Sequence, residues 1–397
     1  MEGKSIIINS LQPWDITIGS NAKDIAWQMA EQNYVLYINT PLDFLTLFSK
    51  ENTPETQYRR DVIRRKVAPI RQIKERLHVL DFPFPILPIN FLPDGKCFDF
   101  FNRLNNRLLY AYVRKKSRAL GYQQVIHIND NDPSRSFYAQ EYLQPHRSIY
   151  YLRDMYAHVP YWQRHIFRLE PLLMQKSHLV IANSPQLASF AQQYMRQAVS
   201  VGQGVWLPSQ TEIDQLRTPA DMQEIPRPII GYTGAITALR LDYDLLYAVA
   251  KERPAFSFVF VGGADDIFHA HPLVKLANVY VLGSKKMSEV LAYNASFDVC
   301  LNPQLQNDMT NCNYPRKIDE YLALGKPIVA TKTETMDIFE GYYAPACSPE
   351  EYLQAIDAAV ASPQDDQTIA ARKKFAQGHS WQKNVERIYR AIQALLD

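Results

Sequence analysis

Short apolar runs alternate with helix-forming segments along this chain, in two separate series. An apolar run followed by an amphipathic segment is typical of a βαβ unit, in which neighbouring strands run parallel and helices cover the sheet. Two series predict two parallel sheets, and hence an α/β protein with two domains. The expected strands of the first series are residues 5–8, 34–38, 77–79, 125–128, 148–151 and 179–181, and those of the second are residues 229–232, 256–261, 279–281, 298–301 and 328–330.

The segment between about residues 202 and 227 separates the two series. It is polar and rich in glycine and proline, which favours an irregular connection. A chain of 397 residues is long enough to bury two cores of ordinary size. We therefore expect domains at residues 1–205 and 206–380. The last segment, residues 381–397, carries apolar side chains at helical spacing and is expected to form an amphipathic helix.

The segment NYPRKIDEYLALGKPIVAT, from Asn313 to Thr331, combines a helix start with a strand. Pro315 suits the first helical turn, where its missing N–H would have no partner, and Asn313 is placed to cap that helix. Free N–H groups and the helix dipole then favour an anion just before the helix. Lys317 adds a positive charge there, and Glu320 follows on the same helical face.

The spacing of Lys317 and Glu320 indicates a nucleotide. At a rise of roughly 1.5 Å per residue, the Glu320 carboxylate lies about 7 Å beyond the helix start, which is close to the span from a diphosphate to its ribose. The segment therefore predicts a site for a nucleotide-diphosphate sugar. An ordinary surface helix with an ion pair between Lys317 and Glu320 is the alternative.

The pattern P-x-K-x-x-E-Y-L-A-x-G-x-P-I-V-A in this segment resembles the donor site of GT-B glycosyltransferases, especially family 4 and related membrane-associated enzymes of polysaccharide assembly. Further segments recur in the order typical of that group: IIGYTGAI, FVFVGG, VLG and FDVCLNP, which begin at residues 229, 258, 281 and 297. The resemblance implies two Rossmann-like domains that face each other across a cleft. It further implies an N-terminal acceptor domain, a C-terminal nucleotide-sugar domain, and a final helix, 381–397, that packs back on the N-terminal domain.

The same resemblance assigns roles to single residues. Glu320 would hold the ribose hydroxyls and Lys317 the diphosphate. The basic pair that such enzymes carry after the first strand of this domain is reduced to Arg240, so Arg316 would share the phosphate charge. Many family 4 enzymes carry a second glutamate eight residues before Glu320, where this chain has Cys312. That departure leaves the donor-sugar contacts open.

Residues that follow the expected strands are further candidates, because ligands of doubly wound sheets lie beyond the carboxyl ends of the strands. Gly19 and Ser20 precede an expected helix, with Ser20 as its cap. Gly234 follows one strand and would let a ligand approach the main chain, with simple turn chemistry as the alternative. Gly283 ends another strand, where relatives place the nucleobase. The predicted donor site comprises Gly19, Ser20, Gly234, Arg240, Gly283, Asn313, Tyr314, Pro315, Arg316, Lys317 and Glu320.

Asp154 is the candidate general base, and Lys317 the other catalytic candidate. Asp154 follows the run SIYYLR, and a carboxylate at a cleft could accept the proton of an acceptor hydroxyl. Several inverting GT-B enzymes look similar at this point, whereas family 4 enzymes retain configuration, and we favour retention. A helix-capping role for Asp154 is the alternative.

The tripeptide Asp130-Asn131-Asp132 has the D-x-D form with which GT-A glycosyltransferases hold a metal. We interpret it as a turn or an acceptor-side element, because it lies within the first strand series and in a turn-rich string. His127 is expected to be structural, and His269 and His271 have no cysteine nearby to complete a metal set. We therefore expect no metal. The resemblance to GT-B glycosyltransferases implies no cofactor and a nucleotide-diphosphate sugar, expected to be a UDP-sugar, as the donor substrate.

Charge is segregated along the chain. Residues 1–200 hold 25 Lys and Arg against 17 Asp and Glu, a net +8 within a total of +2. Basic residues gather at 59–76 and 103–118, and the apolar segment FPFPILPINFLP, residues 82–93, lies between them. This pattern favours peripheral contact of residues 59–118 with an anionic membrane surface over nucleic-acid binding. A segment packed on the core, beside a solvated basic helix, is the alternative.

Four scattered cysteines, no signal peptide and no apolar run of membrane-spanning length predict a cytoplasmic protein at the inner face of the membrane. The predicted function is transfer of a sugar from a nucleotide-diphosphate sugar to a hydroxyl of a glycan or lipid-linked acceptor in cell-surface polysaccharide assembly. A sugar-nucleotide epimerase or hydrolase of the same fold, and a catalytically idle binding subunit, remain as alternatives.

Overall fold

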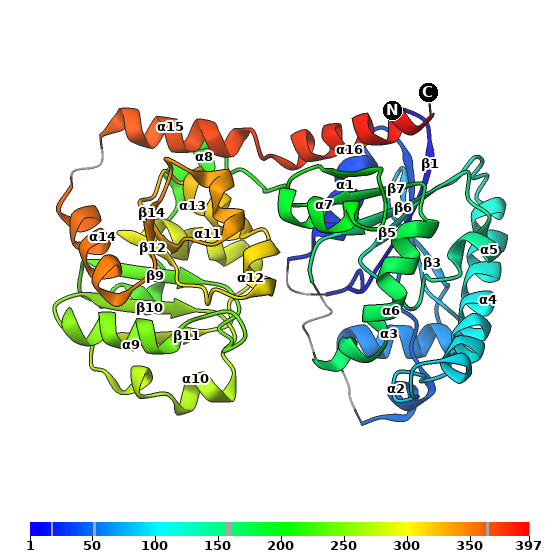
Figure 1. The fold of residues 1–397 in the computed structure, drawn as a ribbon, viewed down its shortest axis with the longest axis horizontal. Helices are drawn as coiled ribbons and strands as arrows, with labels where there is room; N and C mark the ends of the chain where they lie inside the picture. Colours follow the sequence, from blue (N-terminus) through cyan, green and yellow to red (C-terminus); the bar gives the residue numbers. More distant parts are fainter. Residues whose placement is uncertain (17–18, 51–52, 156–159, 363–364, 397) are drawn as a thin grey trace. The chain divides into compact units, whose positions relative to one another are not determined.

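The computed structural model describes residues 1–16, 19–50, 53–155, 160–362 and 365–396 (Figure 1). The chain divides into two compact units. Unit 1 comprises Met1–Gly202 together with Asn384–Asp397, and unit 2 comprises Gln203–Lys383. Each unit contains one sheet with helices around it, so the predicted α/β class with two parallel-sheet domains is confirmed.

Unit 1 contains an eight-stranded sheet with the strand order β3-β4-β2-β1-β5-β6-β7-β8. All neighbouring strands are parallel except β3 and β4. The six strands predicted for this half are present, and every residue of the central β1 is buried, which explains its apolar run. The strands are β1 (Ser5–Ser10), β2 (Tyr34–Ile38), β3 (Ile70–Lys74), β4 (Leu77–Leu80), β5 (Ile126–Asp130), β6 (Arg147–Leu152), β7 (Leu179–Ala182) and β8 (Ala198–Ser200).

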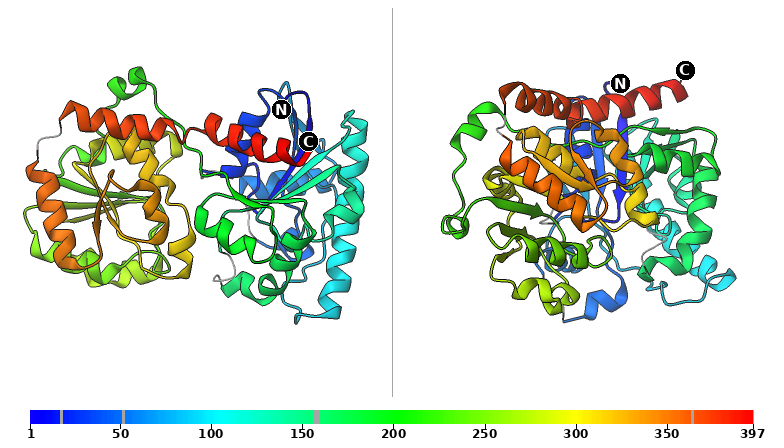
Figure 2. Two further views of the ribbon diagram at one scale, coloured as in Figure 1. Left: turned by 45° about the horizontal axis from the view of Figure 1, so that its top comes forward. Right: turned by 60° about the vertical axis from the view of Figure 1, so that its left-hand side comes forward.

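Helices cover both faces of this sheet (Figure 2). The long helix α4 supplies Leu109, Tyr110 and Val113 to the core, where they pack with Ile7 and Leu36 of the central strands. The helices of unit 1 are α1 (Asn21–Met29), α2 (Phe44–Phe48), α3 (Pro54–Ile63), α4 (Lys96–Ala119), α5 (Ala139–Leu143), α6 (Pro160–Lys176), α7 (Pro185–Gln192) and most of α16 (Trp381–Leu396).

The C-terminal segment of unit 1 is fastened by hydrogen bonds to residues far away in the sequence. Asn384 Nδ2 donates to the carbonyl oxygens of Val201, at 3.0 Å, and Gly202, at 2.8 Å. Asn33 Nδ2 donates to the Tyr389 hydroxyl at 2.8 Å. Because Asn384 and Asn33 are fully buried, these bonds fix the segment in the core of unit 1.

Unit 2 contains a six-stranded sheet, entirely parallel, with the order β11-β10-β9-β12-β13-β14. Alternate residues of β9 face opposite helix layers: Ile230 and Tyr232 join the cluster beneath α9 and α14, whereas Ile229 joins the cluster beneath α11 and α13. All five predicted strands are present. The strands are β9 (Ile229–Thr233), β10 (Ser257–Val261), β11 (Val279–Gly283), β12 (Val299–Asn302), β13 (Ile328–Thr331) and β14 (Ala344–Ala346).

The helices of unit 2 fill both of its outer layers (Figure 2). They are α8 (Gln210–Gln215), α9 (Tyr243–Glu252), α10 (Asp266–Ala270), α11 (Met287–Ser296), α12 (Asp308–Cys312), α13 (Arg316–Ala323), α14 (Pro349–Ala361) and α15 (Asp366–Gln377). The described residues of this unit also form the 3₁₀ segments Ala220–Met222, Pro272–Lys275 and Glu334–Phe339. Among the described residues of both units, no helix is both long and apolar enough to cross a membrane.

Candidate functional site

Helix α13 begins at Arg316, with the buried Pro315 at its N-cap position. The Arg316 N–H donates to the Tyr314 carbonyl oxygen at 3.1 Å. Within the described part of the chain, the main-chain N–H of Lys317 has no acceptor, so the start of α13 presents a free donor. The sequence correctly placed a helix start and a free donor at this point.

Asn313 does not cap α13, so that prediction was wrong. Asn313 is the C-cap residue of the preceding helix α12, and its N–H donates to the Met309 carbonyl oxygen at 3.0 Å. Helix α12 itself was not predicted, although Asn307 and Thr310 form a capping box at its start. Since α12 ends at Cys312, only three residues separate it from α13, and Asn313 is used to end α12.

The Lys317 side chain lies over Tyr232, near the carboxyl end of β9. Its Nζ donates to the Tyr232 hydroxyl at 2.5 Å and lies 3.8 Å from the centroid of the ring. The Tyr232 hydroxyl in turn donates to the Ala235 carbonyl oxygen at 3.0 Å. Tyr232 was not among the predicted site residues. Its position near the end of a strand was the sequence feature that could have identified it.

Burial, as the largest cause, and the nearby positive charge of Arg240 together lower the pKa of Lys317 to about 7, against the opposing effect of the Glu320 carboxylate. A lysine that loses solvent without gaining an anionic partner is destabilised in its charged form. An anion bound beside Nζ would supply that partner and raise the pKa. The electrostatics of unit 2 therefore favour a negatively charged ligand at this position.

Glycines bring the carboxyl ends of β9, β10 and β11 close together. Gly234 has φ +133, and a Cβ atom there would lie 3.0 Å from Lys317 Nζ. At Gly262, φ is +151 and a Cβ atom would lie only 1.8 Å from the Gly234 carbonyl oxygen. The Gly262 N–H donates to the Gly283 carbonyl oxygen at 2.9 Å, and a Cβ atom on Gly283 would meet nothing within 4 Å. Gly234 and Gly262 thus allow the strand ends to pack closely, and the space beside Gly283 is open for a ligand to approach the main chain.

Glu320 pairs with Arg316 and not with Lys317. Arg316 Nε and Glu320 Oε1 are 3.1 Å apart, at i,i+4 spacing, and both side chains are half-buried. The alternative of an ordinary ion pair between Lys317 and Glu320 is therefore not what the structure contains. Arg240 is half-buried, and its carbonyl oxygen accepts from the Leu305 N–H at 2.8 Å.

The Tyr314 side chain is used within unit 2. Its hydroxyl donates to Asp319 Oδ2 at 2.7 Å, and Asp319 Oδ1 lies 2.7 Å from His379 Nδ1. The Tyr314 ring also packs edge-on against Phe339. If a ligand binds at the start of α13, only the main-chain atoms of Tyr314 are therefore available to contact it.

Buried polar atoms after β12 and β13 were missed by the sequence reasoning. Within the described residues, both amide atoms of Asn302, Oδ1 of Asn313 and Oγ1 of Thr333 have no hydrogen-bond partner. Burying such atoms unpaired is costly, and hydroxyl groups of a ligand could satisfy them. Asn302 ends β12 and Thr333 follows β13, so position at a strand end was the available signal.

Three predicted site residues, Gly19, Ser20 and Asp154, belong to unit 1. Ser20 caps α1 as predicted, with its side chain accepting from the Lys23 N–H at 3.5 Å, and the half-buried Gly19 precedes it. Asp154 is half-buried just after β6, and its N–H donates to Asn131 Oδ1 at 2.9 Å. Among the predicted residues of unit 2, the structure brings Gly234, Arg240 and Glu320 close to Lys317.

Both aspartates of the D-x-D tripeptide are paired with arginines. Asp130 binds the buried Arg153, with 2.8 Å between Oδ2 and Nη2, and Asp132 Oδ2 lies 2.8 Å from Arg135 Nε. His127 Nε2 lies 2.7 Å from Asn9 Oδ1, and burial lowers its pKa to about 3, as expected for a structural histidine. The described residues contain no group of three His, Cys, Asp or Glu side chains arranged to hold a metal ion.

Part of the predicted basic and apolar surface of unit 1 is used internally. Arg60 is buried and donates to the Thr46 and Ser49 carbonyl oxygens at 2.9 and 2.8 Å. Arg71 pairs with the Asp15 and Asp81 carboxylates, and Phe82 and Ile86 of the segment 82–93 are buried. For these two side chains of the segment, the alternative of packing on the core is therefore correct.

Cys312 ends α12, and none of the four cysteines forms a disulfide. Burial raises the pKa of the half-buried Cys312 thiol, and the charges of Glu334 and Asp308 raise it further. A glutamate at position 312 would thus stand near two other carboxylates.

Residues 227–362 match the family model described as glycosyl transferases group 1. They form a group 1 glycosyl transferase domain. The predicted donor residues from Gly234 to Glu320 lie in this domain, whereas Gly19, Ser20 and Asp154 lie outside it. The chain is 25% identical over 161 residues to the putative teichuronic acid biosynthesis glycosyltransferase TuaH of Bacillus subtilis (strain 168). That match covers 38% of this chain and 40% of TuaH, so the chain spans about two fifths of this curated relative.

Solved structures resemble the group 1 domain together with the rest of the chain. Sucrose-phosphate synthase from Thermosynechococcus elongatus has a TM-score of 0.68 at 14% identity and covers 99% of both chains. Anabaena HepE in complex with UDP and glucose has a TM-score of 0.65 at 17% identity, covering 98% of this chain and 100% of HepE. These likenesses show the fold, and the predicted GT-B fold is confirmed.

Proposed function

We propose that the protein is a glycosyltransferase that moves a sugar from a nucleotide-diphosphate sugar, with UDP as the nucleotide, to a hydroxyl of a glycan or lipid-linked acceptor. The group 1 domain supports the reaction class. The name of TuaH supports cell-surface polysaccharide assembly as the setting, and the UDP and glucose bound by HepE support the donor. A sugar-nucleotide epimerase or hydrolase finds no support among these relatives.

The half-buried Lys317 at the start of α13 is the observation that carries this proposal. Its ammonium group, with its pKa lowered to about 7, stands beside Gly234, and the main-chain N–H of Lys317 at the start of the same helix has no acceptor among the described residues. In the proposed reaction, the diphosphate binds these donors, and Glu320 binds the ribose hydroxyls. Negative charge grows on the diphosphate as it leaves, and donors already aimed at it stabilise the transition state without reorganisation.

Stereochemistry and proton transfer remain part of the proposal. We favour retention of configuration, without an obligatory metal, and the alternative gives Asp154 the role of general base in an inverting reaction. Proton NMR of the newly formed glycosidic bond distinguishes the two, because the anomeric coupling reports its configuration. If the product has inverted configuration and Asp154→Asn abolishes its formation, the reaction is inverting, with Asp154 as the general base.

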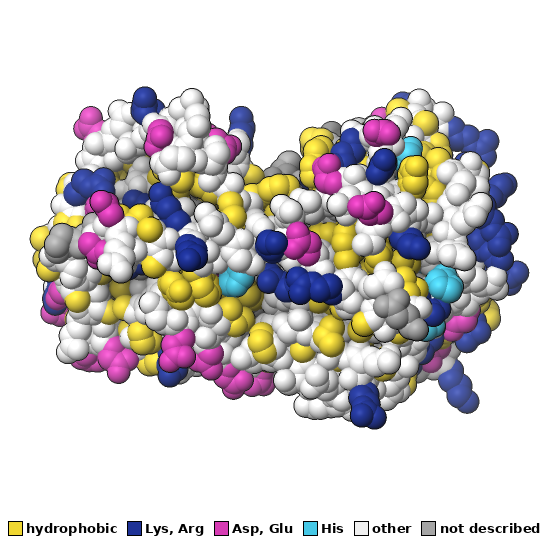
Figure 3. All heavy atoms as spheres, turned by 90° about the horizontal axis from the view of Figure 1, so that it is seen from above, with side chains coloured by type: hydrophobic (Ala, Val, Ile, Leu, Met, Phe, Trp, Pro, Cys, Tyr) yellow, Lys and Arg dark blue, Asp and Glu magenta, His cyan; other side chains and the backbone are white. Residues whose placement is uncertain are grey.

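The proposal also places the protein on an anionic membrane surface at the cytoplasmic face. The outer face of α4 carries Phe100, Leu104 and Leu108 at i, i+4 and i+8 spacing, which are 65%, 47% and 45% exposed. The exposed Arg103 and Arg107 flank this stripe. Figure 3 shows Lys and Arg side chains gathered along the edge of unit 1. Apolar side chains flanked by cations are typical of helices that lie in the interface of an anionic bilayer.

A thermal-shift screen tests the donor assignment directly, because a ligand that binds the native state raises its melting temperature. The ligands are UDP, GDP, ADP, CMP and their common sugar conjugates. We expect a shift with UDP and UDP-sugars that is lost in Lys317→Ala. No shift with any nucleotide would contradict the proposal and favour the idle binding subunit, and turnover of a UDP-sugar without an acceptor would favour the epimerase or hydrolase.

A further inference from the structure

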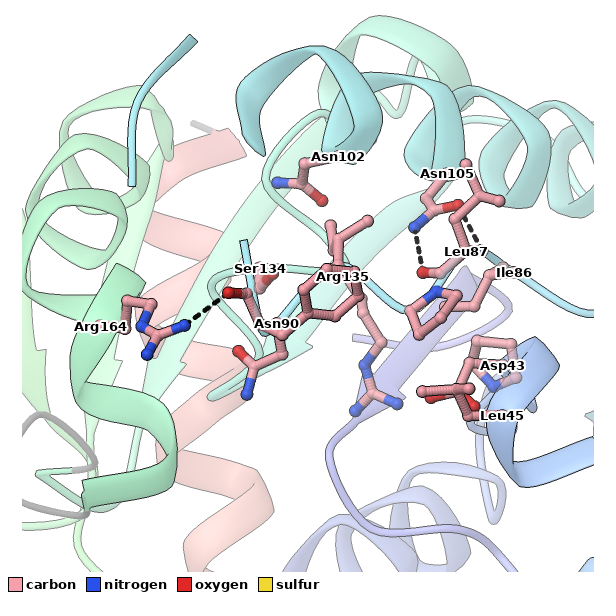
Figure 4. Close-up of a pocket in the computed structure, with 14 residues that line it drawn as sticks. Asp43, Leu45, Ile86, Leu87, Asn90, Asn102, Asn105, Ser134, Arg135 and Arg164 are labelled. Carbon is pink, nitrogen blue, oxygen red and sulfur yellow. Dashed lines mark hydrogen bonds between the residues drawn. The ribbon is translucent and has the colours of Figure 1, made fainter. Parts of the chain in front are cut away.

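A cavity of about 530 Å³ opens within unit 1 (Figure 4). Its walls come from the beginning of α2, the segment 86–91, the first turns of α4 and the turn that contains Ser134 and Arg135. Ligand sites in proteins commonly have volumes of roughly 300–1,000 Å³. The cavity therefore has room for a small organic ligand or for one end of a larger one.

The cavity lies beyond the carboxyl edge of the unit 1 sheet. A second, smaller cavity shares Pro41 and Arg135 with it and is lined by Asn9 and Ser10 at the end of β1 and by Asn39 just after β2. Open parallel sheets bind their ligands at this edge. The topology of unit 1 thus places the cavity where a substrate of this unit is expected.

One wall of the cavity is apolar and continues onto the surface. Ile86 is buried, whereas Leu45 and Phe91 are 66% and 65% exposed. Phe48, at the end of the same helix α2 as Leu45, is 80% exposed. Because water solvates such side chains poorly, this wall and its rim suit an apolar chain that enters from the surface.

Arg135 supplies a fixed cation to the same cavity. Its Nε lies 2.8 Å from Asp132 Oδ2, and its main-chain N–H donates to Asp132 Oδ1 at 3.0 Å. In the described part of the molecule, its two terminal nitrogens make no hydrogen bond, and Figure 4 shows the side chain extending into the space between the walls. A guanidinium held at one edge presents its other donors in a geometry that matches phosphate oxygens.

Two neighbouring polar groups point to a ligand as well. Asn102 is 1% exposed and lines the cavity, and its Nδ2 has no partner among the described residues. Arg164 donates to the Phe91 carbonyl oxygen at 2.6 Å and so brings a second cation to the apolar segment. The one carboxylate in the lining, Asp43, already accepts from the Thr46 N–H at 2.7 Å.

We propose that this cavity binds the phosphate end of an amphiphilic lipid. The phosphate lies on the terminal nitrogens of Arg135, near Asn102, and the lipid chain follows the apolar wall past Ile86 to Leu45 and Phe91. This inference rests on the proposed function, because it identifies the lipid-linked acceptor as a lipid phosphate. A free glycan would leave the apolar wall and its exposed rim without a partner.

Binding of farnesyl phosphate, farnesol and inorganic phosphate to the full chain tests the proposal by calorimetry below the micelle concentration. We expect farnesyl phosphate to bind at least tenfold more tightly than farnesol, which lacks the phosphate, or inorganic phosphate, which lacks the apolar chain. Arg135→Gln should weaken farnesyl phosphate about tenfold by removing a charge-assisted hydrogen bond, and leave farnesol unchanged. Arg114→Gln, on the outer part of α4 away from the cavity, is the matched control and should change neither.

A second variant keeps the test decisive if Arg135→Gln does not fold. Leu45→Glu changes an exposed rim residue and places a carboxylate at the mouth, so it should also weaken farnesyl phosphate about tenfold. If inorganic phosphate binds as tightly as farnesyl phosphate, the cavity is a site for free anions and the lipid proposal is overturned. If both variants bind farnesyl phosphate as tightly as the unchanged protein, the proposal is likewise overturned. UDP binding is measured in parallel: farnesyl phosphate bound without UDP contradicts the proposed function alone, and UDP bound without farnesyl phosphate contradicts the cavity alone.

Discussion

The carboxyl edges of the two sheets differ in chemistry although both belong to parallel α/β units. In unit 2, the edge is lined by Gly234, Gly262 and Gly283, with the Lys317 ammonium held over Tyr232. In unit 1, the edge opens into a cavity with an apolar wall and the Arg135 guanidinium. In the functions proposed above, a common sheet architecture thus offers one edge to a compact anion and the other to an amphiphile.

The surfaces of the two units differ in the same direction. Of 17 large apolar side chains that are exposed in the described residues, only four belong to unit 2: Trp206, Leu239, Ile267 and Met287. Residues 1–200, nearly all of unit 1, also carry the net charge of +8. In the proposed function, the more apolar and more basic surface of unit 1 is the one that contacts an anionic bilayer.

The largest expected effect comes from removing the cation of unit 2. Lys317→Ala should lower kcat by about two orders of magnitude or more, because it removes a donor aimed at the charge that develops on the leaving diphosphate. The melting temperature should not fall, since burying that ammonium already costs stability. Steady-state kinetics and thermal unfolding measure both. The exposed Lys275, changed to alanine, is the control, and near-normal kcat in Lys317→Ala would refute the assignment.

Removing the apolar stripe of α4 tests the other side of the comparison. The double variant Phe100→Ser, Leu104→Ser should lower partitioning onto vesicles with anionic lipid by more than tenfold, because each buried side chain contributes about 1.5–3 kcal/mol. Co-sedimentation measures the partitioning, and UDP-glucose affinity should stay unchanged. Ile267→Ser removes an exposed apolar side chain of unit 2 and should have no effect. Equal losses in both variants would remove the distinction between the units.

Glu320→Ala should weaken donor binding about tenfold, through loss of a charge-assisted hydrogen bond to the ribose. Calorimetry with UDP, and with inorganic pyrophosphate, which lacks a ribose, separates the two parts of the ligand: only UDP should lose affinity. Because Glu320 also pairs with Arg316 at 3.1 Å, Arg316→Ala is measured beside it. An unchanged UDP affinity in Glu320→Ala would rule out the ribose role.

The smallest predicted effect is a pH dependence of donor binding. The pKa of Lys317, lowered to about 7 in the free protein, rises when the diphosphate binds, so binding takes up a proton. Affinity for UDP-glucose should therefore fall about fivefold from pH 7 to pH 8, as the free lysine loses its charge. Calorimetry in two buffers of different ionisation enthalpy detects the proton. The arginine of Lys317→Arg stays charged, so its affinity for UDP-glucose should not change between pH 7 and pH 8. If the pH dependence persists in this variant, a group other than Lys317 takes up the proton.

The sequence predicted both sheets because their inner strands are buried on both faces and read as apolar runs. The edge strand β3, IRQIK, was missed since its residues are only partly buried and it runs antiparallel. The order of the strands in the sheet could not be predicted from the sequence. Strand β1 lies between β2 and β5, and no residue near β1 in the sequence specifies β5 as its neighbour. Pairing between distant segments is a property of the whole sheet and leaves little trace in either segment.

The same division holds for the candidate site. The i,i+4 pair of Arg316 and Glu320 was within reach of the sequence, because four residues make one helical turn. The contact between Lys317 and Tyr232 was not, since the two residues lie 85 positions apart. The error at Asn313 followed from missing α12, a helix of five residues with too few positions for a periodic pattern.

The hydrogen bonds from Asn384 to Val201 and Gly202 have a consequence for biosynthesis. Unit 2 is one uninterrupted stretch, so all of its residues have been synthesised once the ribosome has passed Lys383. Unit 1 begins first but cannot be finished until residues made after all of unit 2 arrive. In a nascent chain, all residues of unit 2 are therefore present before the last residues of unit 1, and the surface of unit 1 that binds α16 stays uncovered until then.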